Sequence, residues 1–325
     1  MFSRICLAAA AVSSALPAHA GDAVAEKRPV KVLMIGNSFT ASVMAEAPAL
    51  AKAEGLALDI VQCGIGGCPL DRHWANVEKS GDKEFKPYSI SARFSSDPRR
   101  RLPRTANVTD MLVAEKWDIV TIQQASGKSA FFETYEPYAG NLIAKIRELA
   151  PQAEIVVQQT WSYAPYDSRL ASWKMTPAEM YGALKKAYAQ LAGKYGLRTI
   201  PTGDAVQLFR ERLPVDYGKL LTRAEIAALE NPATIDFHGD VTGRSWWGKG
   251  RKGVQKDADE IKLRMDSPHL NNRGEYLQAC VWLGFLFGVD PTTFSHKPDS
   301  LPEADAKLMR ECARDALGAA AARRK

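Results

Sequence analysis

Two short segments far apart in the sequence carry the side chains best suited to chemistry. A Gly-Asn-Ser-Phe segment at 36–39 directly follows the apolar run 32–35, so Ser38 comes just after a strand-like pattern. Near the other end, Asp266 and His269 lie three residues apart, shortly before a helical pattern. A serine, an imidazole and a carboxylate are the nucleophile, base and orienting acid of a serine hydrolase. We therefore expect the serine and the imidazole to lie within hydrogen-bond reach, with the carboxylate on the far side of the ring.

Each motif also has a plain structural interpretation. Ser38 alone could be a helix cap, and the Asp-x-x-His segment could be a surface turn in which Asn271 and Asn272 cap the next helix. A metal half-site is a weaker interpretation, because no second ligand cluster is visible in the sequence. The combination favours catalysis, and we predict neither a metal nor a cofactor.

Strand-like runs alternate with helical patterns along most of the chain. Their hydrophobicity is continuous, as in strands buried on both faces of a parallel sheet. The order predicts a three-layer α/β/α fold around a mostly parallel five-stranded sheet. The predicted strands are Val32–Ile35, Leu58–Val61, Ile119–Ile122, Ile155–Val157 and Leu197–Ile200. The predicted helices are Ser42–Ala53, Tyr138–Leu149, Pro177–Lys194 and Ala205–Arg212.

Two stretches do not fit this alternation. Residues 79–104 have little periodicity and many charges, so we expect a long excursion over the surface. We interpret residues 213–264 as an insertion with one short helix at 223–230, since they have too few apolar positions for a core of their own. One main domain would then cover 30–290, followed by a C-terminal helical extension and tail at 291–325.

The first 20 residues have the pattern of a secretory signal, with an apolar core and an A-x-A-like site at 18–20. No later apolar run reaches the roughly 18 residues of a membrane span. We therefore expect a secreted or periplasmic protein without a membrane span.

The net charge is +6, and the densest basic run is 99–101 with Arg104. That run could be a solvated loop or could meet an anionic partner such as an acidic glycan. Export argues against a nucleic-acid partner.

Four cysteines remain once Cys6 is removed with the signal. An even number in an oxidising compartment favours disulfides over metal or redox roles. Four cysteines allow three pairings, of which local spacing favours Cys63–Cys68 with Cys280–Cys312.

The two end motifs together resemble those of the SGNH (GDSL-like) hydrolase family. The segment 36–39 resembles its first block, with Asn37 where many members carry Asp, and 266–271 resembles its last block, Asp-x-x-His. In particular, the chain resembles a Gly-Asn-Ser-Phe branch with many uncharacterised proteins of carbohydrate-degrading bacteria. The resemblance spans roughly Val30 to Phe287, leaves the 213–264 insertion unaccounted for, and implies an SGNH/flavodoxin-like sheet.

In that family, glycine and asparagine blocks complete the oxyanion hole. The glycine loop 63–68 follows the second strand, where the resemblance implies Gly67 as a donor, with Gly66 next. The usual Gly-x-Asn-Asp block is absent, and the third strand ends in Gln-Gln-Ala-Ser. A glutamine offers the same amide donor as asparagine, so we choose Gln124, with Ser126 next.

Several aromatic and polar residues could contact a substrate. His73 lies just beyond the glycine loop and could line the site or be a structural histidine. Trp161 follows the fourth strand and could stack on a sugar or lie in the core, and the same choice applies to Trp246 and Trp247.

The resemblance implies an exported esterase in which Ser38 attacks an ester carbonyl, with a carbohydrate O-acetyl ester as the expected substrate. An O-acyltransferase with the same triad is one alternative. A non-catalytic glycan-binding protein on a degenerate hydrolase fold is the other, suggested by the missing asparagine block. The oligomeric state stays open.

Overall fold

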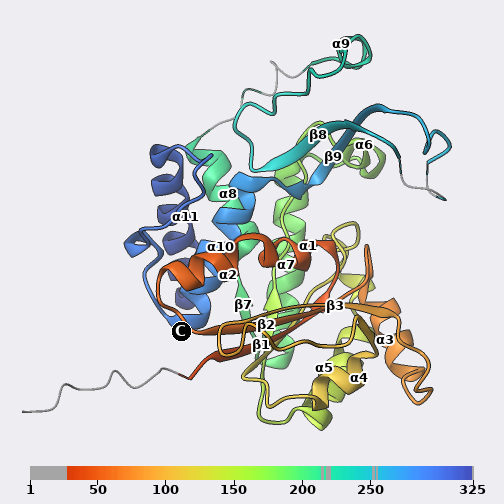
Figure 1. Cartoon of the computed structure of the whole chain (residues 1–325), viewed down its shortest axis with the longest axis vertical. Coiled ribbons are helices and arrows are strands. Elements are labelled where there is room, and N and C mark those ends of the chain that lie inside the picture. Colours follow the sequence, from red (N-terminus) through yellow and green to blue (C-terminus); the bar gives the residue numbers. More distant parts are fainter. Residues whose placement is uncertain (1–27, 214–215, 217–220, 251–252, 254, 324–325) are drawn as a thin grey trace, which may run out of the picture.

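The computed structural model describes residues 28–213, 216, 221–250, 253 and 255–323. The predicted signal at 1–20 lies outside these residues. A seven-stranded sheet with the order β4-β3-β2-β1-β5-β6-β7 lies between two groups of helices, and a separate two-stranded sheet, β8-β9, projects above it (Figure 1).

The five predicted strands are confirmed, and all five run parallel. They are β1 (Val30–Gly36), β2 (Leu58–Gly64), β5 (Ile119–Ile122), β6 (Glu154–Gln158) and β7 (Arg198–Ile200). Because both faces of the sheet are covered, Val32, Leu33 and Met34 are fully buried. β1 lies between β2 and β5, as in the strand order of flavodoxin-like folds. In such folds, ligands bind beside the carboxyl end of the first strand, at the point where the strand order reverses. The predicted fold class is therefore confirmed.

Two antiparallel strands extend the sheet beyond β2 and were not predicted. β3 (Tyr88–Phe94) pairs with β2, and β4 (Thr105–Ala106) pairs with the start of β3. The expectation of a surface excursion over 79–104 is thus wrong for this part. β3 buries Tyr88 and Phe94 but exposes polar residues between them, so it lacks the continuous apolar run of a central strand.

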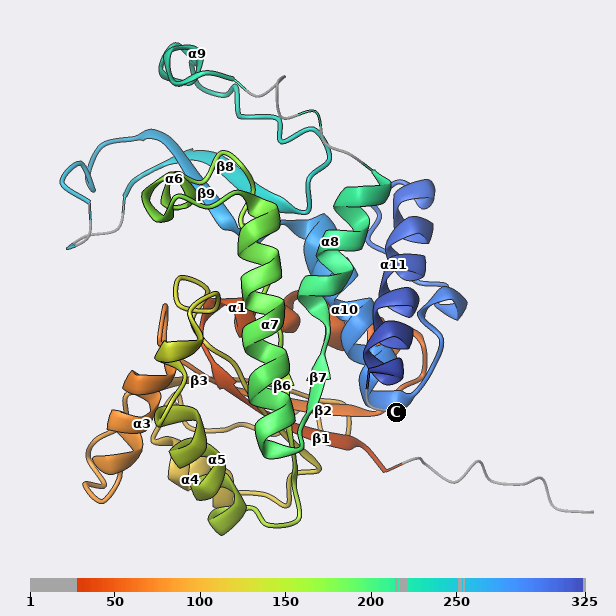
Figure 2. The same cartoon turned by 180° about the vertical axis from the view of Figure 1, so that it is seen from behind.

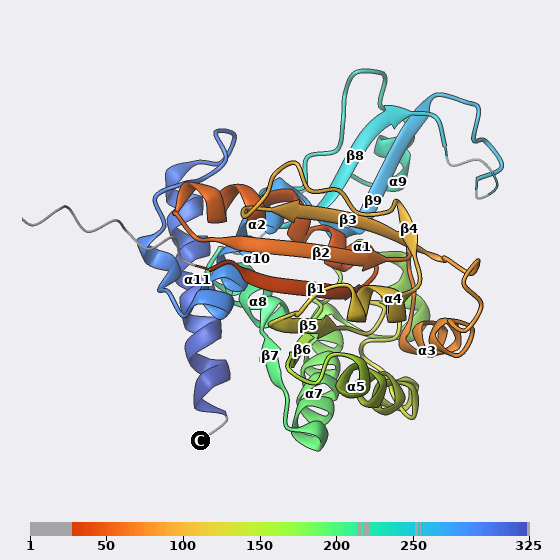
Figure 3. The same ribbon diagram turned by 60° about the horizontal axis from the view of Figure 1, so that its bottom comes forward.

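Two helical layers cover the sheet (Figures 1 and 3). One contains α2 (Val43–Ala53), α8 (Thr202–Arg212), α10 (Asn272–Phe287) and α11 (Glu303–Ala322). The other contains α3 (Leu70–Glu78), α4 (Val108–Val113) and α5 (Tyr138–Leu149), with α7 (Pro177–Tyr195) beside β7. The short elements are α1 (Ser38–Ala41), α6 (Ser168–Trp173) and α9 (Arg223–Ala227), with the 3₁₀ helices Phe132–Thr134 and Pro291–Thr293. In the described part of the chain, no helix has both the length and the apolar content needed to cross a membrane.

A hairpin carries the Asp-x-x-His motif. β8 (Thr242–Gly248) and β9 (Lys262–Leu270) pair antiparallel and lie above α1, at the carboxyl end of the parallel strands (Figure 2). The buried guanidinium of Arg264 donates to the backbone oxygens of Gly248, Asp257 and Glu260 and so closes the hairpin tip. The motif therefore lies in a strand, not in the surface turn that was the alternative interpretation.

The predicted disulfides are wrong, because all four cysteines of the described chain are free, buried thiols. Cys63 lies within β2 and packs in the core, whereas the thiol of Cys68 faces the carbonyl oxygen of Pro69 at 3.7 Å. Cys280 and Cys312 lie on α10 and α11 and pack as small apolar residues, as buried thiols commonly do.

We predict that thiol titration distinguishes these states. A chain lacking residues 1–20, so that Cys6 does not contribute, should yield four reactive thiols when unfolded in guanidinium without reductant. In the native state the same thiols should react slowly, because burial raises the pKa of Cys68 to about 12 and that of Cys312 to about 11. Only two reactive thiols in the unfolded chain would contradict the free-thiol structure.

Candidate active site

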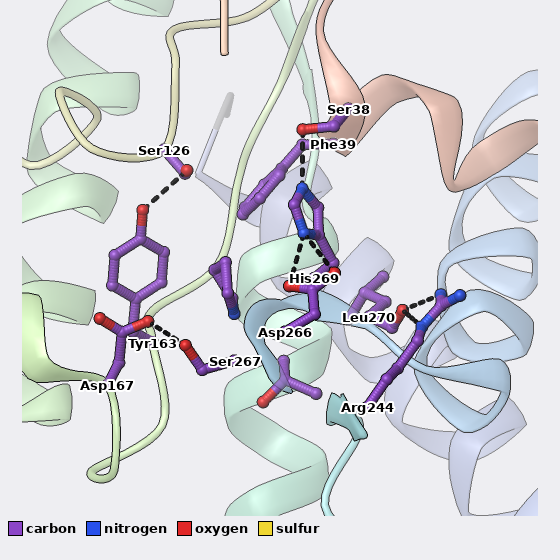
Figure 4. A network of polar contacts seen from close by, with 12 residues as sticks. Ser38, Phe39, Ser126, Tyr163, Asp167, Arg244, Asp266, Ser267, His269 and Leu270 are labelled. Carbon is purple, nitrogen blue, oxygen red and sulfur yellow. Dashed lines mark hydrogen bonds and ion pairs between the residues drawn. The ribbon is translucent and has the colours of Figure 1, made fainter. Parts of the chain in front are cut away.

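Ser38, His269 and Asp266 form one chain of hydrogen bonds. Ser38 is the first residue of α1, directly after β1, and His269 lies near the end of β9. His269 Nε2 is 2.7 Å from Ser38 Oγ, and His269 Nδ1 is 2.7 and 2.9 Å from the two carboxylate oxygens of Asp266 (Figure 4). The expected geometry is confirmed, with the carboxylate on the far side of the imidazole from the serine.

The charge of Asp266 determines the direction of these hydrogen bonds. Partial burial raises its pKa, but the hydrogen bond with His269 and the nearby cation of Arg244 outweigh burial, so the pKa lies below its ordinary value. An ionised carboxylate only accepts hydrogen bonds, so His269 Nδ1 carries the proton and donates. Nε2 is then the acceptor for the Ser38 hydroxyl. In this state the imidazole can take the proton of Ser38.

Amide side chains from neighbouring elements hold the first part of the turn that carries Ser38. Gln62 of β2 donates to the carbonyl oxygen of Asn37 at 3.0 Å, and Gln123, just after β5, donates to Asn37 Oδ1 at 2.7 Å. Asn37 in turn donates from Nδ2 to the carbonyl oxygen of Cys68 at 3.1 Å. These contacts tie the turn both to the sheet and to the glycine loop.

The next peptide group is held in the same way. The carbonyl oxygen of Phe39 accepts hydrogen bonds from Ser42 at 2.8 Å, Gln158 at 3.3 Å and Gln278 at 3.4 Å. Gln158 belongs to β6 and Gln278 to α10, so the sheet and a helix that covers it both reach the turn. Sequence analysis missed these residues, because a lone glutamine in an apolar run gives no signal of what it contacts.

Trp161 is a core residue with no exposed surface to offer a substrate. It is fully buried, its ring stacks on that of Phe39 at 4.1 Å, and its indole N–H donates to the carbonyl oxygen of Pro268 at 2.9 Å. The Phe39 ring also meets the His269 ring edge to face at 5.2 Å. Trp161 therefore positions His269 from behind, and its prediction as a sugar platform is wrong.

His73 is likewise a structural residue. It is fully buried, and its Nδ1 is 3.0 Å from the hydroxyl of Tyr88. Burial lowers the pKa of His73 to about 4, so the ring is neutral near pH 7. Because the ring of His73 is fully buried, it does not line the surface around Ser38, and the prediction that it does so is wrong.

The glycine loop offers a backbone donor near Ser38. Gly67 is exposed and has a φ of +62°, a conformation that glycine adopts without strain. The hydrogen bond from Asn37 to Cys68 brings this loop beside the nucleophile turn. Within the described residues, the N–H groups of Ser38 and Gly67 donate to no backbone or side-chain acceptor.

Gln124 does not face this space. Its Nε2 donates to the carbonyl oxygen and hydroxyl of Thr134, and its Oε1 accepts from the backbone N–H groups of Leu70 and Ala125. All its polar atoms are engaged in the core, so it has no N–H left for a substrate. This corrects the predicted oxyanion set.

The second choice for this donor, Ser126, has a hydroxyl proton to give. Its half-buried Oγ accepts a hydrogen bond from Tyr163 at 2.8 Å, which leaves the hydroxyl proton free to donate (Figure 4). A ring contact supports Tyr163, since the guanidinium of Arg169 lies 4.1 Å over it.

Arg244 on β8 is a site residue that the sequence analysis missed. It lies directly opposite Asp266, and its Nε donates to the carbonyl oxygen of Leu270 at 3.0 Å, while its guanidinium also pairs with Glu275 of α10. A bulge at Gly243, with φ +91°, precedes it. No sequence signal links Arg244 to Asp266, because the pairing depends on a hairpin that was not predicted.

On its other side, β9 is held by α6. Ser267 donates from Oγ to Asp167 at 2.7 Å (Figure 4), and Asp167 forms an ion pair with Arg169. The Asp-x-x-His segment is thus fixed from both sides. In the described part of the chain, no three His, Cys, Asp or Glu side chains gather as a metal site would require.

The chain is similar to known proteins in both sequence and structure. A family model described as a domain of unknown function, DUF4886, matches residues 31–213. The crystal structure of a DUF4886 family protein from Bacteroides uniformis has a TM-score of 0.68 at 25% identity, covering 89% of this chain and 95% of that chain. Among curated proteins, nothing matches the sequence.

Proteins named as SGNH and GDSL-like hydrolases are among the structural neighbours. One, from Slackia heliotrinireducens and provisionally described as an SGNH hydrolase, has a TM-score of 0.44 at 18% identity, covering 78% of this chain and 97% of that chain. A GDSL-like lipase from Bacteroides thetaiotaomicron has a TM-score of 0.39 at 13% identity, covering 82% and 93%. At these TM-scores, neither likeness carries an argument about chemistry.

We predict that Arg244→Gln raises the pKa of Asp266, because the carboxylate loses a nearby cation that favours its ionised form. The measurement is an NMR titration of the Asp266 carboxyl carbon. Arg244→Lys keeps the charge and should give a smaller rise, and Arg99→Gln, a distant exposed control, should give none. An Asp266 titration that is unchanged in Arg244→Gln would leave Arg244 with a packing role alone.

Proposed function

The chain belongs to the DUF4886 family, and from the geometry around Ser38 we propose that it is a serine esterase. The observation that carries the proposal is the 2.7 Å contact between Ser38 Oγ and His269 Nε2, continued at 2.7 Å from Nδ1 to Asp266. A helix cap or a surface turn would not need a serine, an imidazole and a carboxylate in this order. The intact triad also speaks against the alternative of a degenerate, non-catalytic fold.

In the proposed mechanism, Ser38 Oγ attacks the carbonyl carbon of the ester while His269 accepts the hydroxyl proton. Asp266 stays ionised and stabilises the imidazolium that forms. His269 then gives the proton to the departing alkoxide, which leaves as an alcohol, and an acyl group remains on Ser38. Water, deprotonated by His269, attacks the carbonyl carbon of this acyl-enzyme. The bond between that carbon and Ser38 Oγ then breaks, His269 returns its proton to Ser38 Oγ, and the carboxylic acid is released.

The oxyanion of each tetrahedral intermediate needs preorganised donors. We propose the N–H groups of Ser38 and Gly67 together with the hydroxyl of Ser126, in place of the amide of Gln124. Support comes from hydrogen bonding, since the two backbone donors have no acceptor within the described residues, and Tyr163 already occupies a lone pair of Ser126. Tyr163 fixes the rotamer of Ser126, so the donor is in place before the substrate binds.

Hydrolysis is favoured over transfer to a second alcohol. The side chains of His269 and Asp266 are 31% and 27% exposed, so water can reach the acyl-enzyme. The related O-acyltransferase reaction would need this water to be excluded.

We further propose a carbohydrate ester as the substrate, with the protein acting in the secreted or periplasmic space. The aromatic platform would be Trp246, which is 46% exposed, and not the buried Trp161. Trp246 lies opposite Arg264 on the hairpin, two positions along β8 from the Arg244–Asp266 pair and on the same face. That spacing is about 7 Å, which suits a sugar ring next to the ester.

We predict that Ser38→Ala lowers the hydrolysis of a chromogenic acetyl ester on the order of 10⁴-fold or more, because it removes the nucleophile. The melting temperature should change little, since the turn is held through Asn37 and Phe39. Ser80→Ala, a serine at the end of α3, is the matched control and should retain full activity. An active Ser38→Ala protein would refute the triad mechanism.

We also predict that the corrected oxyanion donor can be distinguished from the original one. Ser126→Ala should lower kcat by about 10²–10³ with little change in KM, as loss of one oxyanion donor typically does. Gln124→Ala should instead lower the melting temperature, because it leaves the N–H groups of Leu70 and Ala125 without an acceptor. If Ser126→Ala is silent in kcat, the hydroxyl is not a donor.

A further inference from the structure

A sizeable cavity in the described part of the chain lies away from Ser38. It is a groove of about 930 Å³ between the C-terminal half of α2, the start of β2, the second half of β3 and the loop that follows β3. Ser38 lies beyond the opposite end of β2, so the strand Leu58–Gly64 separates the two places. Figure 3 shows β3 along the edge of the sheet with its C-terminal end near α2.

The floor of the groove is aliphatic. Leu56, Ile90, Ala92 and Leu102 line it and are only half-buried, so they present apolar surface to whatever fills the space. A volume of this size with mostly apolar walls and a few polar groups is typical of sites for small molecules.

The rim of the groove is cationic. Lys52, Arg93, Arg100 and Arg101 line it, and no Asp or Glu is among the lining residues. Arg100 is neutralised by Glu115 at 2.9 Å and covers the Phe94 ring at 4.6 Å. The other three cations form no ion pair within the described residues.

Carboxylates next to the lining residues in the sequence have partners of their own, and Asp97 contacts Arg99. Asp59 accepts hydrogen bonds from Ser95 and Ser96, and Glu54 accepts from the backbone N–H groups of Ser295 and His296. None of these carboxylates forms an ion pair with Lys52, Arg93 or Arg101, so these three cations can pair with a ligand. For the basic run 99–104, the sequence analysis left two interpretations open: a solvated loop or a contact with an anionic partner. The groove favours the second interpretation for Arg101.

We infer that this groove binds a single-chain anionic amphiphile, a molecule with an aliphatic chain and one carboxylate head. The chain would lie on Leu56, Ile90 and Leu102, and the carboxylate would meet Lys52, Arg93 and Arg101. An acidic glycan fits less well, because the aromatic ring among the lining residues, Phe94, is buried beneath Arg100 and offers no stacking face. The inference does not depend on the proposed esterase activity.

Isothermal titration calorimetry with dodecanoate below its micellar concentration tests the inference. Dodecanoate should bind one site, 1-dodecanol should bind at least about tenfold more weakly, and acetate should not bind. Arg93→Gln combined with Arg101→Gln should weaken binding by about tenfold or more, since charged hydrogen bonds are lost. Arg99→Gln combined with Arg104→Gln is the matched control, because it also removes two positive charges, from arginines that do not line the groove.

Two further variants test the location of the ligand and its independence from Ser38. Ala92→Trp should abolish binding by filling the groove, provided that circular dichroism shows a normal melting transition. Ser38→Ala should bind dodecanoate normally, even if the esterase mechanism is wrong. Equal binding of dodecanol, an equal effect of the control pair, or binding of anionic vesicles or polygalacturonate but not of dodecanoate would each overturn the inference.

Discussion

Hydrogen bonds from amide side chains to the turn 37–39 are the interaction on which the rest of the site depends. The turn lies where the chain leaves β1. The carbonyl oxygen of Asn37 accepts from the backbone N–H groups of Thr40 and Ala41 as well as from Gln62, and that of Phe39 accepts from the side chains of Ser42, Gln158 and Gln278. An unpaired buried acceptor costs about 1–3 kcal/mol, so the bonds from Gln158 and Gln278 to the carbonyl oxygen of Phe39 stabilise the turn most directly. Gln62 and Gln123 add hydrogen bonds to the carbonyl oxygen and the side-chain oxygen of Asn37. Because these glutamines come from β2, β5, β6 and α10, the position of Ser38 is set by the packing of the whole sheet.

The second half of the site has a different origin. Asp266 and His269 lie on a hairpin outside the main sheet, and the indole N–H of Trp161 links that hairpin to the nucleophile turn through Pro268. The three groups meet only when the hairpin is docked on the sheet. The site therefore depends on both the main sheet, which carries Ser38, and the hairpin, which carries Asp266 and His269.

The sequence was sufficient for the features that depend on local pattern. Continuous apolar runs identify all five parallel strands, and reactive residue types in a short motif identify Ser38, Asp266 and His269. β3 and the hairpin were missed, because edge strands mix polar and apolar residues and β9 is largely polar or charged. Gln124 was misassigned for another reason: the direction of a side chain just past a strand depends on which backbone groups nearby need partners. The contact between Arg244 and Asp266 could not be predicted, because it depends on the register of the hairpin.

The glutamine contacts have a consequence for how the site responds to its surroundings. Amides do not titrate and carry no net charge, so neither pH nor ionic strength acts directly on the bonds that hold the turn. The half of the site on the hairpin is instead built from ions, with Arg244, Glu275 and Asp266 close together. The fold thus places the nucleophile on a turn held by uncharged groups and the imidazole base beside a network of ions. A change of pH or ionic strength therefore acts on the surroundings of the base and leaves the bonds that hold the turn unchanged.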